Sequence, residues 1–489
     1  MKAESDIFLI DHALTLSDSD VNHLRSQIAS YPQLTDRIGA MFGVDTSSVE
    51  TDKEAATNQI LEKFWKFANC YHVSGSVPGG GASTVWFVMD EMGSAVAHSS
   101  DPNVTCVPFM YIQPPLASSS AGVAVQSAQP QLTPFSLMWP LRDIACEEYV
   151  ERDFCSWIST PVERVAYLAD WVAGIDEDLL GQLTAGATYH QELLAETTAK
   201  GGLGGEVFLA REGVERFMAG RQPALAAVEG QGERGGALKV FTPPYDPLRL
   251  HSSFGGLSHP SFALVDRRED ADILWLSDPM KPEEAAEFWG GGGGGEGGGG
   301  CPVRRLVNQF PYEGVFCMKN NLSREVARCV GSPQWWPPCF DLETQLPIFV
   351  GRFLNNRQAG GEEEANSGGS GGGSGGADYN VWIAKPSNST RSAGHVVSGS
   401  LIRLVRALEA DKARVAQKYI ERPLLFQGKY KFDMRFVVLV RSLELGREEV
   451  YVYRDFWCRV ANKPHHLEAQ ASLQQASEEA ETAGGLNAA

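Results

Sequence analysis

Three charged residues at alternate positions give this sequence its first chemical signal. Lys431, Asp433 and Arg435 occupy every second position at the start of the run KFDMRFVVLVR, which predicts a strand with all three on one face. Because unpaired buried charge is costly, such a face either lies in solvent or meets a polyanion such as a nucleotide phosphate. Upstream, the apolar run VWIAKP presents Lys385 near its end, where a proline stops the sheet ladder.

The neighbouring residues predict the elements that position these charges. The opposite face of the charged strand is continuously apolar. It comprises Phe432, Met434, Phe436, Val438 and Val440. Between the two lysines, residues 398–410 place apolar side chains at helical spacing, with Ser398 or Ser400 as the N-cap. A strand, a helix and a second strand are therefore expected in this order.

The first third of the chain predicts helices and a strand that pack a core. Residues 21–42 carry apolar side chains at helical spacing, and Pro32 divides them into two helices. Residues 58–71 are expected to form a third helix, and residues 84–91 a strand. Residues 117–134, rich in Ser, Ala, Pro and Gln, are expected to form an exposed insertion.

The middle of the chain predicts connecting segments. Helices are expected within 161–228, and the apolar run 273–276 predicts a buried strand of a small α/β unit. The glycine-rich tracts 290–300 and 360–377 predict flexible insertions, because they cannot bury enough apolar surface to fold.

Composition narrows the classes of protein. The 489 residues suffice for two or three domains, and the 43% hydrophobic and 21% charged content is typical of a soluble globular protein. The net charge of −19 argues against binding nucleic acid or anionic membrane non-specifically, and no run approaches the ~18 apolar residues that span a bilayer. The nine cysteines form no CxxC pair. Together with a polar amino terminus they favour a cytoplasmic protein.

Two pieces of the first half together resemble the closing half of a SET domain. They are Ala97-His98-Ser99-Ser100-Asp101-Pro102-Asn103 and Asp143-Ile144-Ala145-Cys146-Glu147-Glu148-Tyr149, the latter ending in Asp153-Phe154. Ala97 stands where that family has an Asn that helps to hold S-adenosylmethionine, and Phe154 stands where it has the catalytic Tyr. We therefore expect a SET-like scaffold for protein partners, and methyl transfer is the least favoured function. His98 is expected to be structural.

From about residue 238 to 465 the chain resembles the tubulin–tyrosine ligase-like family, whose catalytic core is an ATP-grasp fold. The resemblance rests on several short motifs that occur in the family's order. They are Ala271-Asp272-Ile273-Leu274-Trp275, Val307-Asn308-Gln309-Phe310-Pro311, Trp382-Ile383-Ala384-Lys385-Pro386, Gln417-Lys418-Tyr419-Ile420, Lys431-Phe432-Asp433-Met434-Arg435 and Asp455-Phe456-Trp457-Cys458-Arg459. A SET-like half before a ligase-like half narrows the resemblance to members with this two-part architecture.

The resemblance implies an α+β fold class with four parts. These are an N-terminal SET-like β-rich domain (1–160), a helical connector (161–237), a C-terminal ATP-grasp domain (238–465) and a disordered tail (466–489).

The resemblance also implies a nucleotide site and a substrate site. The residues expected to bind ATP are Lys385, Gln417, Lys418, Tyr419, Ile420, Lys431 and Asp433. Within this set, Lys385 contacts phosphates, residues 417–420 form a hinge whose main-chain groups take the adenine edge, and Lys431 and Asp433 face phosphate and ribose. Arg435, as a catalytic residue, and Arg459 bind a carboxylate of the amino acid or of the tubulin tail, to which a guanidinium can bond bidentately.

The implied reaction uses ATP and Mg²⁺ to activate a carboxylate, which an amine then attacks to form an amide. Active members carry a Gly-rich loop where this chain has 387–395, and a later Glu-x-Asn that holds magnesium, where this chain has an Ala-, Glu- and Gln-rich tail. The residues present thus predict no metal ligands and a ligase-like protein of weak or absent activity toward tubulin. The alternative is a non-catalytic regulatory scaffold that binds tubulin or other partners through both halves.

Overall fold

The computed structural model describes most of the chain in two compact units. The described residues are 1–3, 5–17, 24–46, 53–73, 83–113, 131–172, 177–200, 236–244, 246, 260–276, 306–309, 313–366, 380–389, 394–409, 413–442 and 449–465. The first unit joins Met1–Thr198 to Gly331–Ala489, and the second is Ala199–Val330.

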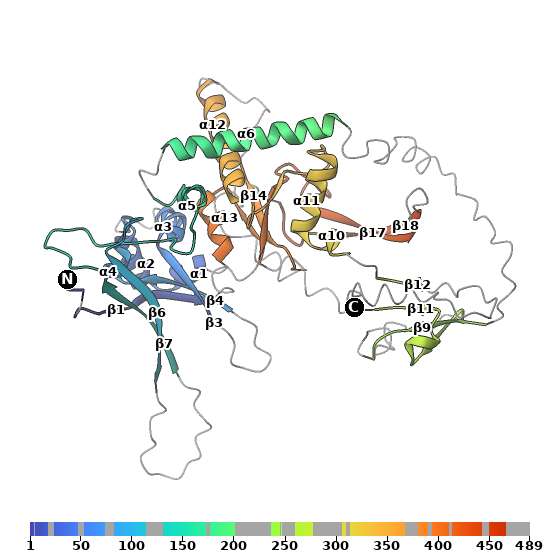
Figure 1. Cartoon of the computed structure of the whole chain (residues 1–489), viewed down its shortest axis with the longest axis horizontal. Helices are drawn as coiled ribbons and strands as arrows, with labels where there is room; N and C mark the ends of the chain where they lie inside the picture. The colour runs from blue at the N-terminus through green and yellow to red at the C-terminus, as the bar shows by residue number, and fades with distance from the viewer. Residues whose placement is uncertain are drawn as a thin grey trace, which may run out of the picture. The chain divides into compact units, whose positions relative to one another are not determined.

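The first unit opens with two antiparallel three-stranded sheets and a short parallel pair. One sheet has the order β1 (Phe8–Ile10), β7 (Gln131–Pro140), β6 (Val104–Gln113), and the other has the order β2 (His12–Ser17), β4 (Ser83–Met89), β3 (Ala68–Val73). The pair consists of β5 (Ala97–His98) and β8 (Glu151–Arg152). In Figure 1 the β6–β7 hairpin extends away from the rest of this half.

The helices of the first half pack on one of these sheets. They are α1 (Leu24–Ser30), α2 (Pro32–Met41), α3 (Lys53–Phe67) and the short α4 (Glu91–Ser94). The predicted division at Pro32 is confirmed, since this proline occupies the first turn of α2, where its missing N–H costs nothing. Ile28, Ile60 and Phe64 are fully buried against Trp86 of β4.

For this half, the predicted C-terminal ends of one helix and of one insertion are wrong. The helix expected over 58–71 ends at Phe67, because residues 68–73 pair residue by residue with β4 as strand β3. The insertion expected over 117–134 ends earlier, because β7 begins at Gln131, opposite Gln113. Residues 114–130 lie outside the described residues.

The ligase-like half of the first unit is built on a four-stranded antiparallel sheet. Its order is β13 (Cys339–Asp341), β16 (Arg414–Lys418), β14 (Trp382–Pro386), β15 (Val396–Ser398). The helices packed with it are α5 (Pro161–Leu168), α6 (Glu177–Ala199), α12 (Leu346–Asn366) and α13 (Leu401–Arg406), which continues as the 3-10 turn η5 (Ala407–Glu409). Phe349, Phe353 and Trp382 form the centre of this core. The strand predicted to end at Pro386 is confirmed.

Helix α13 is buried on two sides. Leu401, Leu404 and Val405 belong to the core of the ligase-like sheet, whereas Ile402 is packed in the core of the SET-like helices. Ser400 is the N-cap residue but makes no side-chain cap bond, and Ser398 Oγ instead accepts from the Ser400 N–H at 3.0 Å. Because one short helix belongs to both cores, the two halves of the first unit are packed together (Figure 1).

Helices α6 and α12 cross at a glycine. A Cβ placed on Gly351 would lie 2.0 Å from the main-chain oxygen of Leu183, so no larger residue fits without moving backbone. Asn355 Nδ2 donates to the Thr184 carbonyl at 3.1 Å beside this crossing. Residues 360–366, the first part of the segment predicted to be a flexible insertion, belong to helix α12. The rest of that segment, and residues 290–300, lie outside the described residues.

The first unit closes with a two-stranded antiparallel ribbon. Strands β17 (Phe432–Ser442) and β18 (Glu449–Val460) pair with an irregularity between Phe436 and Val438. The predicted alternation of faces therefore holds at the charged start of β17 and shifts after Phe436. Apolar side chains of the ribbon are well exposed, Met434 by 53%.

The second unit contains a parallel sheet. Its order is β10 (Phe262–Val265), β9 (Leu238–Phe241), β11 (Ile273–Leu274), β12 (Leu306–Val307), with a 3-10 turn η4 (Arg268–Asp270) and helices α10 (Gly314–Cys317) and α11 (Lys319–Val330). The strand predicted near Ile273 is confirmed as β11, whose Leu274 is buried. Asn308 fastens the end of β12 to the end of β11, bonding both the N–H and the carbonyl of Leu276. Within the described residues, no helix has the length and apolar character needed to cross a bilayer.

Candidate functional site

Two of the predicted nucleotide residues meet on the ligase-like sheet. Lys385 of β14 and Gln417 of β16 lie on adjacent antiparallel strands, and the Lys385 ammonium donates to Gln417 Oε1 at 2.6 Å. The acceptor is a neutral amide oxygen. This pair holds the ammonium in place, and the amide itself adds no negative charge beside it.

The predicted hinge after β16 is fixed by main-chain bonds. The Lys418 N–H donates to the Pro338 carbonyl at 2.8 Å, and the Tyr419 N–H donates to the Val381 carbonyl at 3.0 Å. These two donors are used inside the sheet. Among the hinge residues, Ile420 is the one whose N–H has no acceptor within the described residues, and its side chain is 59% exposed.

A buried carboxylate stabilises the same hinge. Glu421 Oε1 accepts the Val381 N–H at 2.9 Å and pairs with the Lys418 ammonium at 2.5 Å. Both side chains of this ion pair are largely buried. Lys418 therefore contributes its side chain to the fold of the hinge, and its charge is balanced there.

The ribbon is joined to the hinge through Lys431. Its ammonium donates to the hydroxyl of Tyr419. Lys431 directly precedes β17, and its carbonyl accepts the Ala461 N–H from the end of β18 at 2.8 Å. The contact with Tyr419 therefore brings the charged start of the ribbon beside the sheet that carries Lys385 and Gln417.

The charged face of β17 has a net positive charge. Asp433 and Arg459 are directly opposite each other in the ribbon and form a bidentate ion pair, with Arg459 Nε at 2.9 Å from Asp433 Oδ1. The hydrogen bond from Arg459 lowers the pKa of Asp433, and the nearby charge of Arg435 lowers it further. One carboxylate thus faces three cations, counting Lys431. Arg459, predicted to bind a substrate carboxylate, has Asp433 as its carboxylate partner in this structure.

The loop after Lys385-Pro386 is held by an arginine that sequence reasoning missed. Arg414 lies opposite Pro386 in the sheet, is 4% exposed, and donates to the carbonyl of Gly394. Gly394 has φ +69°, a conformation that favours glycine. The only signal in the sequence is a charged residue at the head of a strand that is otherwise buried. Residues 390–393 lie outside the described residues.

The described residues contain no preformed cluster of metal ligands. They contain no group of three or more His, Cys, Asp or Glu side chains placed to hold a metal. The carboxylate on the cationic face, Asp433, is already bound by Arg459. Magnesium at a nucleotide site takes one or two carboxylates together with phosphate oxygens and water, so most of its ligands at this site would come from the nucleotide and from water.

The two residues that depart from the SET pattern, Ala97 and Phe154, are both part of the packed or paired structure of the SET-like half. Ala97 and His98 form β5, and His98 Nδ1 accepts the Phe154 N–H at 3.2 Å. The Phe154 ring packs 4.9 Å from the centre of Trp171 and lies under the guanidinium of Arg152. Burial lowers the pKa of His98. The predicted structural role of this histidine agrees with these contacts on β5.

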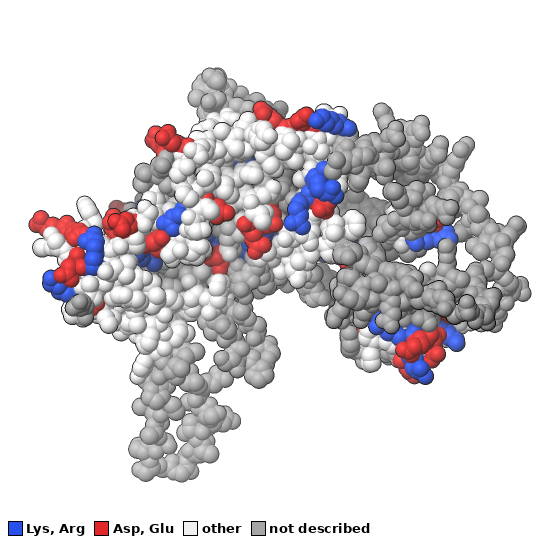
Figure 2. Space-filling model, viewed as in Figure 1, with Lys and Arg blue, Asp and Glu red and all other residues white. Residues whose placement is uncertain are grey.

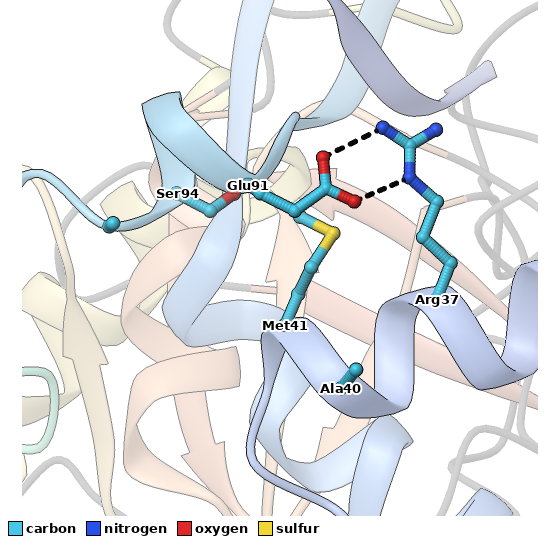
Figure 3. Close-up of a pocket in the computed structure, with 6 residues that line it drawn as sticks. Arg37, Ala40, Met41, Glu91 and Ser94 are labelled. Atoms are coloured by element: carbon cyan, nitrogen blue, oxygen red, sulfur yellow. Dashed lines mark hydrogen bonds and ion pairs between the residues drawn. The ribbon is translucent and has the colours of Figure 1, made fainter.

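A pocket of about 340 Å³ in the SET-like half lies away from all the predicted site residues. Figure 3 shows that the Arg37 guanidinium of α2 and the Glu91 carboxylate of α4 face each other there in a bidentate pair, with Nε to Oε1 at 2.8 Å. The hydrogen bonds from Arg37 lower the pKa of Glu91 to about 2. Figure 2 shows acidic and basic side chains interspersed on the visible face of this half.

Two family models match this α+β chain, one in each half. The model "Tubulin tyrosine ligase SET-like domain" matches residues 1–174, and the model "Tubulin-tyrosine ligase family" matches residues 302–477. Both models describe domains of tubulin–tyrosine ligases, and the SET-like match precedes the ligase match along the chain. The resemblance and the fold class predicted from sequence motifs are thereby confirmed.

Individual relatives agree with this assignment. The chain is 30% identical over 476 residues to tubulin–tyrosine ligase-like protein 12 of Mus musculus. The aligned region covers 95% of the chain and 61% of the mouse protein. The protein of the same name from Caenorhabditis elegans is 24% identical over 519 residues, covering 94% and 67%. Tubulin polyglutamylase TTLL7 of Xenopus tropicalis is 24% identical over 219 residues, covering 43% and 20%. The chain thus spans about three fifths of the length of its mouse and human relatives. The domain boundaries predicted at 160 and 237 remain predictions.

Proposed function

We propose that this chain binds ATP between the β14–β16 sheet and the charged start of β17, in a protein that acts on tubulin. The observation that carries the proposal is the Lys431–Tyr419 contact. It unites a cationic ribbon face, a hinge and the lysine-bearing sheet in one place. A nucleoside triphosphate needs this combination of a main-chain edge for the base and positive charge for the phosphates.

The chain's own residues have distinct parts in this proposal. Lys385 exchanges its bond to Gln417 for a phosphate oxygen, and Lys431 supplies a second cation on the opposite side. The Ile420 N–H, which has no acceptor within the described residues, is the hinge donor left for the adenine edge. Its neighbours Lys418 and Tyr419 use their N–H groups within the sheet. Of these three residues, Ile420 is therefore the one proposed to donate to the adenine.

Bound ATP supplies the phosphoryl group that activates a carboxylate, and the protein contributes position and charge. Arg435 lies two positions beyond Asp433 on the same face of β17, so its guanidinium is free of the cross-strand pair that holds Arg459. We assign the carboxylate of the amino acid or acceptor to Arg435 first. Asp433 orients Arg459 toward that carboxylate. Ligation is proposed to be weak, because residues 387–395 replace the Gly-rich loop that active members carry.

Nucleotide binding is tested by thermal stabilisation. ATP at about ten times its Kd adds about 1.4 kcal/mol to the free energy of unfolding, which raises the Tm by a few degrees. Lys431→Ala and Lys385→Ala are expected to reduce this shift, whereas Lys66→Ala, an exposed lysine on α3, leaves it unchanged. No shift at millimolar ATP, with or without Mg²⁺, contradicts the proposal.

Tubulin as the acceptor is inferred from the relatives, whose names include a tubulin polyglutamylase and a tubulin glycylase. The test incubates the chain with detyrosinated tubulin, ATP and labelled tyrosine, glutamate or glycine. Slow incorporation that is lost in Arg435→Ala supports ligation. Label that persists in this variant excludes the assignment of Arg435.

A scaffold is the second candidate, favoured by the packing of Phe154 between Arg152 and Trp171. Phe154, at the position of the catalytic Tyr of SET domains, is thus used for packing. We therefore propose that the SET-like half binds protein partners. Co-sedimentation with microtubules separates the candidates. Binding that survives Lys431→Ala and Arg435→Ala, without incorporation of any label, supports the scaffold.

A further inference from the structure

A cavity lies between the SET-like and ligase-like halves of the first unit, away from the nucleotide residues. Its volume is about 590 Å³, which is within the range of small-molecule and side-chain pockets. Both halves line it. Cys70 comes from β3, Trp157 and Tyr167 from the region of α5, and Leu342 and Leu408 from the ligase-like half. In Figure 1 α5, α3 and α13 come together in this part of the unit.

One end of the cavity is polar but already balanced in charge. The Glu409 carboxylate pairs with the buried Arg406 and accepts from the Tyr167 hydroxyl. The Cys70 thiol lies 3.2 Å from Glu409 Oε2. Burial and the adjacent carboxylate raise the pKa of Tyr167, which therefore stays a neutral hydroxyl. This end gives the cavity fixed hydrogen-bonding groups and no uncompensated charge.

Two further carboxylates at the cavity are not balanced. Glu163 accepts the Thr160 hydroxyl at 2.6 Å, and Glu343 has an exposed side chain, while its main-chain N–H donates to Asp341 Oδ1 at 3.2 Å. Neither carboxylate has an ion pair within the described part of the chain, and no lysine or arginine is among the described residues that line the cavity. His72 is the remaining titratable group there, with Nδ1 3.3 Å from Thr84 Oγ1. The cavity thus attracts a cation.

The walls between these carboxylates favour a cation with an apolar stem and a flat head. Leu342, Leu346 and Leu408 form the apolar lining. Trp157 is 62% exposed, and its ring is nearly perpendicular to the Tyr167 ring, with the two centres 5.5 Å apart, so much of the indole surface remains open for stacking. A guanidinium stacks on an aromatic face and bonds carboxylates bidentately, whereas an ammonium does neither as well.

We infer that this cavity binds the arginine side chain of a basic polypeptide, a function independent of nucleotide binding. The guanidinium lies over Trp157 and bonds Glu163 and Glu343, while its methylenes contact the leucines. The net charge of −19 steers a basic chain toward the protein. Because the cavity has walls from both halves, occupancy also stabilises their packing.

The test is calorimetric titration of the full chain with an acetylated nonapeptide that contains one arginine among glycines and serines. Its matched probe carries citrulline, a neutral isostere, at the same position. Glu163→Gln combined with Glu343→Gln is expected to weaken binding of the arginine peptide by about tenfold or more, and Glu192→Gln on α6 serves as the control. Leu408→Trp, which fills the cavity without removing charge, is expected to abolish binding.

Three results would overturn the inference. They are equal affinity for the arginine and citrulline peptides, unchanged affinity of the double glutamine variant with intact thermal stability, and binding of free agmatine as tight as that of the peptide. The last result would make the ligand a small amine in place of a polypeptide. Quenching of tryptophan fluorescence that disappears in Trp157→Leu places the arginine over this ring.

Discussion

The Arg406 guanidinium donates a hydrogen bond to the main-chain carbonyl of Trp65 at 2.9 Å, across 341 residues of sequence. The same guanidinium lies 4.2 Å from the centre of the Trp171 ring and is ion-paired with Glu409. Arg406 is 1% exposed. The Arg406 side chain is therefore enclosed between the Trp171 ring and the Trp65 carbonyl of the SET-like half.

Arg406→Met is expected to destabilise the first unit by about 3–5 kcal/mol, because Glu409 would remain buried without its cation. The measurement is chemical denaturation followed by circular dichroism. The double variant Arg406→Met with Glu409→Gln should recover part of the loss, since no unpaired charge then remains. Equal losses in the single and double variants would show that the ion pair has no role beyond packing.

Gly351→Ala is expected to cost about 1–3 kcal/mol, because the new methyl group would overlap the Leu183 carbonyl where α6 crosses α12. Gly186→Ala is the matched control on α6. No atom lies within 4 Å of its ideal Cβ, so this variant should gain about 0.5–1 kcal/mol from helix propensity. Thermal denaturation of both variants checks the pair, and a gain in both would mean that the helices separate at Gly351.

The stability of the SET-like half is expected to fall between about pH 6.5 and pH 4 because of His12. Burial lowers its pKa from 6.5 to about 4, and its ring stacks on Phe87 at 3.9 Å. Below pH 6.5 the His12 imidazole is protonated in the unfolded chain but stays neutral in the folded protein. The stability present above pH 6.5 is therefore lost progressively down to about pH 4.

The size of this loss is on the order of 1–2 kcal/mol, less than the full shift because the ring is only partly buried. Thermal denaturation across this pH range measures it. His12→Asn should flatten the dependence, although it also removes the contact between His12 Nε2 and Ser136 Oγ at 2.9 Å. An unchanged slope would assign the acid sensitivity to other groups.

Asp433→Asn is expected to change the free energy of unfolding by less than about 0.5–1 kcal/mol, because the Asp433–Arg459 pair is half exposed. It frees Arg459 and raises the positive charge of the ribbon face. Affinity for ATP should therefore rise, with a steeper decrease on adding salt. The control is Asp455→Asn, whose partner Arg454 lies beside it on β18. An equal rise in both variants would reflect net charge alone.

Local patterns predicted the elements of the site well. Pro32 divides two helices, Pro386 ends β14, and the alternation at Lys431, Asp433 and Arg435 gives the start of β17. Each is a local effect of backbone chemistry or of period-two spacing. The ordered motifs predicted the resemblance to tubulin–tyrosine ligases, which the two family models support.

The contacts between distant segments could not be predicted in this way. Arg406 belongs to a helix whose stripe is apolar, and only its spacing of three from Glu409 hints at an ion pair. Its enclosure by Trp65 and Trp171 depends on how two halves pack. The strand at 68–73 likewise exists because β4 lies beside it, although the helical spacing before Phe67 continues plausibly through these residues.

The double burial of α13 has a mechanical consequence. Because α13 is embedded in two cores, we expect the SET-like half and the four-stranded sheet to move together as one platform. Entry and release of a nucleotide would then require movement of the β17–β18 ribbon. The ribbon is joined to this platform by the hydrogen bond from the Lys431 ammonium to the Tyr419 hydroxyl. We expect the ribbon to move only when the Lys431–Tyr419 hydrogen bond and the contact of His465 Nε2 with the Glu421 carbonyl at 3.4 Å are broken, while the packed cores stay unchanged.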